Sequence, residues 1–162
     1  MDSQGKIVLP LEDNGLYVVL YRQDVDNKWH WSFYLQRYSR QGWIMHATRP
    51  TGFWFYQKRT STTVAFSDSV VSILKIAIIP ADYHDALANR IAEVPLEDTQ
   101  RYGAFTCRTW LLRAIDELND EGHISLKLGT TSQHIEQEAS LKAANAAALG
   151  QRMLENSSHS LA

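Results

Sequence analysis

The chain has 162 residues, of which 44% are hydrophobic and 21% charged, a composition typical of one soluble globular domain. Its 16 basic and 18 acidic side chains give a formal net charge of −2, and no basic run or stripe suggests a nucleic-acid partner. The N-terminus lacks the pattern of a secretory signal, the apolar stretch at 70–79 is too short to cross a bilayer, and the single cysteine cannot form an internal disulfide. We therefore expect a cytoplasmic protein without a membrane anchor.

The first half of the chain is rich in aromatic and β-branched residues, which favour a sheet. An apolar run at 15–21 ends in a polar turn, and 28–37 then alternates. This alternation places Trp29, Trp31, Phe33 and Leu35 on one side, and His30, Ser32, Tyr34 and Gln36 on the other. Such a pattern predicts a strand. Further strands are expected at 43–48, 53–57, 62–66 and 70–79, forming an antiparallel meander of about five or six strands.

The second half is predicted to be helical, which gives an α+β fold with two or three helices packed on the sheet. A helix is expected from Pro80 to Val94, and a second from Cys107 to Glu121, capped by Thr106. A third, alanine-rich helix should begin near Ser132 and end near residue 154. We divide the chain into one domain at 1–128, the C-terminal helix at 129–155 and a disordered tail at 156–162. The third helix has a weak apolar face, so packing on the domain, homo-oligomer formation and fraying all remain open.

Cys107 is the first candidate for chemistry because it begins a predicted helix. The helix dipole and the free N–H groups of the first turn favour a thiolate, so we expect a depressed thiol pKa. The same N–H groups could hold an oxyanion, and Arg108 adds positive charge. The alternative is a buried cysteine that acts only as a small hydrophobic residue.

His30 and His46 are the second and third candidates. His30 could accept the proton of the cysteine thiol, and His46, on the neighbouring strand, could fix the orientation of the imidazole. Thr48, Gln36 or a backbone carbonyl could do the same, and both histidines could be ordinary strand residues. Together with Cys107 they could also ligate zinc. No close-spaced ligand pair accompanies them, so we expect no metal and no cofactor.

Three short motifs carry a resemblance to a known family. They are His30-Trp31-Ser32-Phe33-Tyr34-Leu35, Trp43-Ile44-Met45-His46 and Phe105-Thr106-Cys107-Arg108-Thr109-Trp110. In this order they resemble the permuted papain-like thiol enzymes related to lecithin:retinol acyltransferase. The chain looks closer still to a set of small fungal proteins with an HW-type strand and a CR-x-W helix start, some of which accompany secondary-metabolite pathways. The resemblance covers about residues 15–125, and Thr106 stands where the acyltransferase group usually has Asn.

The resemblance implies a circularly permuted papain-like fold and a cysteine-dependent hydrolase, acyltransferase or acyl cyclase acting on a small-molecule or acyl substrate. Cys107 would attack the carbonyl, His30 would transfer the proton and His46 would orient the imidazole. Candidate substrate-binding residues are Tyr34, Trp54, Tyr56 and Arg108. Two alternatives stay open: a natural-product cyclase or isomerase without a covalent intermediate, and a catalytically silent binding module.

Overall fold

The computed structural model describes residues 7–24 and 28–161 as a six-stranded sheet with three α-helices. The α+β class is therefore confirmed. The strands are β1 (Gly15–Arg22), β2 (Trp29–Tyr38), β3 (Gln41–Thr48), β4 (Phe55–Ser61), β5 (Val70–Ile78) and β6 (Met153–Asn156). The helices are α1 (His84–Ala92), α2 (Cys107–Asp120) and α3 (Ser132–Ala148), with one-turn 3₁₀ helices η1 (Val64–Phe66) and η2 (Ala81–Tyr83). No helix in the described ranges is long and apolar enough to cross a membrane.

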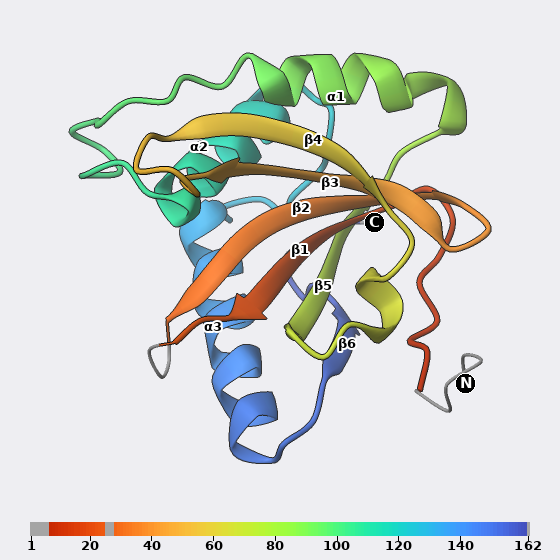
Figure 1. Ribbon diagram of the computed structural model, residues 1–162. Helices are drawn as coiled ribbons and strands as arrows, with labels where there is room; N and C mark the ends of the chain where they lie inside the picture. Colours follow the sequence, from red (N-terminus) through yellow and green to blue (C-terminus); the bar gives the residue numbers. More distant parts are fainter. Residues whose placement is uncertain (1–6, 25–27, 162) are drawn as a thin grey trace.

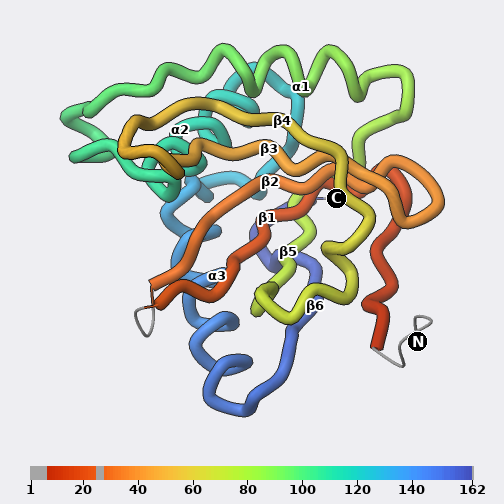
Figure 2. The backbone as a smooth tube through the Cα atoms, in the orientation of Figure 1, coloured from red at the N-terminus to blue at the C-terminus, as the bar shows by residue number. Residues whose placement is uncertain are grey.

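The strand order β4-β3-β2-β1-β5-β6 is a meander only from β1 to β4 (Figures 1 and 2). After β4 the chain returns across the sheet, so β5 pairs antiparallel with β1, and β6 then pairs parallel with β5. The strand expected at 62–66 is wrong, because Val64 and Ala65 are instead buried in the 3₁₀ helix η1. This short helix belongs to the connection that brings the chain from β4 to the free edge of β1.

The two faces of the sheet carry different cores, as the alternation in β2 predicts. Trp31, Phe33 and Leu35 belong to the large core shared with all three helices. In Figure 1 these helices lie behind and around the sheet. Tyr34, on the opposite face, belongs to a smaller cluster with residues of β1, β3, β5 and η1. The helices therefore cover one face, while the other is covered in part by η1 and the N-terminal segment.

The C-terminal region is integral to the domain, which corrects the division made from the sequence. Helix α3 ends at Ala148 rather than near 154, and Gly150 adopts a left-handed φ of 63° before β6. Beyond β6, the N–H of Ser157 donates to the carbonyl of Lys75 at 2.8 Å, and Leu126 bridges Ser160. Residues 157–161 are thus held by backbone hydrogen bonds, and the predicted disordered tail is wrong for this range.

Candidate functional site

Helix α2 begins at Cys107, and its cap is the one predicted. The N–H of Thr109 donates to Oγ1 of Thr106 at 3.2 Å, and the N–H of Thr106 donates to Oγ1 of Thr109 at 2.8 Å. This reciprocal pair satisfies two backbone donors at the helix start. It fixes the direction in which α2 leaves the preceding loop, and with it the position of the cysteine.

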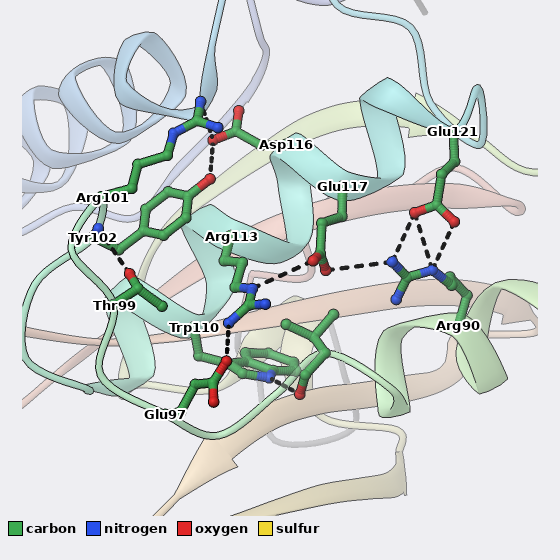
Figure 3. Close-up of polar contacts among 11 residues, drawn as sticks. Arg90, Glu97, Thr99, Arg101, Tyr102, Trp110, Arg113, Asp116, Glu117 and Glu121 are labelled. Carbon is green, nitrogen blue, oxygen red and sulfur yellow. Dashed lines mark hydrogen bonds and ion pairs between the residues drawn. The ribbon is translucent and has the colours of Figure 1, made fainter.

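The segment before α2 is also fastened to the helix further along (Figure 3). The Tyr102 hydroxyl donates to Oδ2 of Asp116 at 2.7 Å. The indole N–H of Trp110 donates to the carbonyl of Val94 at 3.2 Å. Because Trp110 and Asp116 are both on α2, these bonds hold residues 94–106 against the helix that carries Cys107.

The Cys107 side chain is 8% exposed and lies in the large core. Burial raises the pKa of its thiol, because the thiolate would lose its hydration there. The backbone N–H groups of Trp31, Arg108 and Cys107 itself lower that pKa, but their effect does not outweigh burial. The depressed pKa expected from the helix start is therefore wrong, since tertiary burial exceeds the effect of the helix terminus.

A chain of hydrogen bonds links three side chains on neighbouring strands. His30 Nε2 lies 2.6 Å from His46 Nδ1, and His46 Nε2 lies 2.9 Å from Oε1 of Gln57. The Gln57 oxygen can only accept, so His46 Nε2 carries a proton and His46 Nδ1 accepts the proton of His30 Nε2. In the neutral state His30 Nδ1 is then left with a free lone pair, as a general base requires.

Both imidazoles are held neutral. Burial, followed by the proximity of His46 and Arg59, lowers the pKa of His30 to about 4. Burial also lowers the pKa of His46, although the hydrogen bond to Gln57 opposes the shift. Within the described ranges no group of three or more His, Cys, Asp or Glu side chains is arranged to hold a metal ion. The pair is thus uncharged near neutral pH.

A cavity of about 340 Å³ opens on the face of the sheet that the helices leave uncovered. His30 and His46 are in its wall, and the Tyr21 ring lies 5.8 Å from the His30 ring. The other lining residues are Arg22, Gln23, Ile44, Arg59, Thr63, Val64, Ser67 and Ser69. Cys107 is not among these described lining residues and belongs to the helix-side core. The thiol and the cavity therefore lie on different faces of the sheet.

The histidines lie where the sheet divides. The ladder between β2 and β3 reaches only Phe33 and Met45 at this end, whereas β2 stays paired with β1 as far as Trp29 and β3 with β4 as far as Thr48. In Figure 1 the two strand pairs spread apart toward the left, the side on which α2 lies.

The Cys107 thiol is influenced by β2 in this divided region. The backbone N–H of Trp31, the residue after His30, lowers the pKa of the thiol. No hydrogen bond between the Cys107 sulfur and His30 is present in the described residues. The structure therefore brings His30 and His46 into direct contact, and it brings Cys107 to the adjacent backbone.

One family model matches the chain. It is described as a family of unknown function, DUF6540, and it covers residues 16–125. The chain belongs to this family. No curated protein and no solved structure matches the chain. The DUF6540 span runs from β1 to just beyond α2, so it contains both histidines, Gln57 and Cys107, while α3 and β6 lie outside it.

The predicted substrate-binding residues have different environments. Tyr34 is 1% exposed, and its hydroxyl donates to Oε1 of Gln36 at 2.7 Å, so it lies in the core of the sheet. Trp54 packs on Phe105 and Tyr56 packs on Trp110, both on the helix side of the sheet near the start of α2. Arg108 forms an ion pair with Glu136 of α3 at 3.0 Å. Its guanidinium therefore joins two helices rather than facing the cavity.

Three residues of the site were missed in the sequence, namely Tyr21, Gln57 and Arg59. All three lie within the DUF6540 span, and each is set by cross-strand register: Tyr21 pairs with His30, Gln57 pairs with His46, and Arg59 follows two residues later on the same face of β4. All five residues of 57–61 are polar, so no alternation indicated which face Gln57 and Arg59 share, and the sequence did not indicate which strand lay opposite.

Proposed function

We propose that the protein is a cysteine-dependent acyl-transfer enzyme with a circularly permuted papain-like arrangement, acting on an ester, thioester or amide. Cys107 is the nucleophile, His30 the general base and His46 the residue that positions His30. The observation that carries this proposal is the hydrogen-bond chain from Gln57 through His46 to His30. This chain leaves the lone pair of His30 Nδ1 free. The next residue, Trp31, has the backbone N–H that acts on the Cys107 thiol.

The electrostatics support a resting pair in which both partners are neutral. Burial raises the pKa of Cys107 and lowers that of His30, so thiol and imidazole are uncharged near neutral pH. The proton then moves from sulfur to His30 Nδ1 as the sulfur attacks the carbonyl carbon. Cys107 belongs to the helix-side core and His30 lines the cavity on the other face, and no hydrogen bond joins them at rest. This step therefore requires the sulfur to reach His30 Nδ1 through the unpaired opening between β2 and β3.

The remaining steps follow from the same groups. A carbon–sulfur bond forms, the carbonyl oxygen becomes an oxyanion, and the N–H of Cys107 is available to donate to it. The bond to the leaving group then breaks, the leaving group takes the proton from His30, and a thioester remains on Cys107. Water gives hydrolysis, an external acceptor gives transfer, and an internal nucleophile gives cyclisation. In each case His30 takes the proton of the attacking group, the carbon–sulfur bond breaks, and His30 returns the proton to the departing sulfur of Cys107.

A second candidate is favoured by the composition of the cavity wall. The cavity contains His30, His46 and Tyr21 but not Cys107. A small molecule bound there could be isomerised or cyclised by proton transfer to His30 without a covalent intermediate. In that case activity would persist in Cys107→Ala and disappear in His30→Ala.

The test is acylation by 4-nitrophenyl acetate, followed by intact-protein mass. Wild type should gain one acetyl group, Cys107→Ser should gain none at a comparable rate, and His30→Ala should be slower by about a hundredfold. His123→Gln, a histidine substitution outside the cavity wall, serves as the matched control and should react as wild type does. Equal acylation of wild type and His30→Ala would refute the mechanism and leave the non-covalent candidate.

A further inference from the structure

The cavity next to the histidines carries positive charge without an acidic lining residue. Arg22 and Arg59 are both in its wall, and none of its lining residues is Asp or Glu. Neither arginine forms an ion pair among the described residues. Asp68 is close in sequence, but it lines a neighbouring hollow together with Arg22 and has an interaction of its own.

Arg59 is the charge nearest to the reactive groups. It lies two residues after Gln57 on the same face of β4, opposite Ile44 of β3. Its charge acts on three neighbours in the wall, because it lowers the pKa values of His30, His46 and Tyr21. The guanidinium therefore lies close to the side chains that would contact a bound substrate.

Other residues of the wall supply neutral hydrogen-bonding groups. Ser67 and Ser69 share a hydrogen bond of 2.9 Å, and Thr63 lies in the same connection between β4 and β5. The N–H of Arg22 donates to the carbonyl of Ser69 at 2.8 Å, which ties this connection to the end of β1. Hydroxyl groups and a guanidinium facing one cavity are donors for carboxylate or phosphate oxygens.

We propose that this cavity binds an anionic group of the substrate, a carboxylate or a phosphate, and that Arg59 is the specificity-determining residue. The inference deepens the proposed function, because it names the class of molecule on which His30 acts. A volume of about 340 Å³ is that of a small-molecule site. Both histidines are neutral, so the charge that distinguishes an acidic substrate from its neutral amide or ester comes from the two arginines, and Arg59 is the one that acts on His30 and His46.

The adjacent Lys58 provides a matched control. It is on the same strand and has the same charge as Arg59, but its ammonium lies 4.2 Å from the centre of the Trp43 ring, on the other face of the sheet. Arg59→Gln and Lys58→Gln therefore remove the same net charge from neighbouring positions. Any general effect of net charge on anion binding appears equally in both variants.

The experiment is an NMR titration of the imidazole signals of His30 and His46 with succinate, inorganic phosphate and neutral succinamide, at constant ionic strength and pH 7.5. Succinate or phosphate should give saturable shifts in wild type and Lys58→Gln, an affinity at least tenfold weaker in Arg59→Gln, and succinamide should give none. The tighter of the two anions identifies the substrate group. Absence of saturation in wild type, equal weakening in both variants, or undiminished binding in Arg59→Gln would overturn the proposal.

The anion site and the proposed reaction can fail separately. The imidazole titration needs no reaction at Cys107, and acylation by the neutral 4-nitrophenyl acetate needs no anion site. Anion binding without acylation of Cys107 would refute the role of Cys107 as nucleophile and would support the cavity as the substrate site. Acylation without anion binding would support Cys107 as the nucleophile and would refute the role of Arg59 in substrate recognition.

Discussion

Acid should destabilise the folded protein through His30. Burial lowers the pKa of this side chain to about 4 in the fold, whereas an unfolded histidine titrates near 6.5. Above pH 6.5 His30 is unprotonated in both the folded and the unfolded state, so its contribution to the free energy of unfolding is fully present. Between pH 6.5 and 4 the unfolded chain binds a proton that the folded chain does not, so the free energy of unfolding decreases as the pH falls. At ~1.36 kcal/mol per pH unit, the loss at pH 4.5 approaches roughly 2.5 kcal/mol, and about 2 kcal/mol after allowance for partial exposure of the ring.

The assay is urea unfolding of wild type and His30→Gln at pH 7.5 and pH 4.5. The substitution also removes the hydrogen bond to His46, but that loss is present at both pH values and cancels in the difference. Wild type should lose about 2 kcal/mol more than His30→Gln between the two pH values, with an unchanged denaturant slope. An equal pH-dependent loss in both proteins would refute the conclusion that the fold holds His30 neutral.

Three further outcomes are expected. Asp116→Ala should lower the free energy of unfolding by about 3 kcal/mol in urea, because it leaves buried donors from Tyr102 and Ser132 without an acceptor; the exposed Asp120→Ala on the same helix should change it by less than about 0.5 kcal/mol. Gln57→Leu should slow acylation by 4-nitrophenyl acetate about tenfold, since the tautomer of the histidine pair is no longer fixed, and a wild-type rate would contradict this. Truncation after residue 128 should abolish the cooperative thermal transition, because it removes the core residues of α3, and a wild-type melting curve would show that α3 is dispensable.

The parts of the site that could be predicted from sequence depend on short-range signals. Thr106 and Cys107 are adjacent to the helix that they begin, so the cap followed from local chemistry alone. The alternation around His30 placed Trp31 on the opposite side of the strand from His30, as the structure has it. The contact between His30 and His46 required only that their strands form a hairpin, which a turn between them indicated.

The parts that could not be predicted depend on tertiary contacts. Gln57 became the partner of His46 through the register of β4, which no local pattern determines. Burial of Cys107 reversed the expected direction of its pKa shift. The helix dipole follows from the local sequence, whereas the desolvation of the thiol depends on the residues that pack around it in the folded protein. β6 has only four residues, half of them polar, and it is a strand because β5 offers it an unpaired edge.

The division of the sheet explains why these groups meet in one place. Backbone N–H groups need partners, so a ladder that stops inside a sheet leaves donors to be satisfied in another way. Beyond Phe33, β2 no longer pairs with β3, and the backbone N–H of Trp31 acts on the Cys107 thiol by lowering its pKa. Across the same opening the side chains of His30 and His46 form the bond that the backbones do not. The end of the β2–β3 ladder thus leaves room for the start of α2 and for the imidazole pair. A substitution that extended this ladder would engage the N–H of Trp31 in the sheet and would leave no space for His30 and His46.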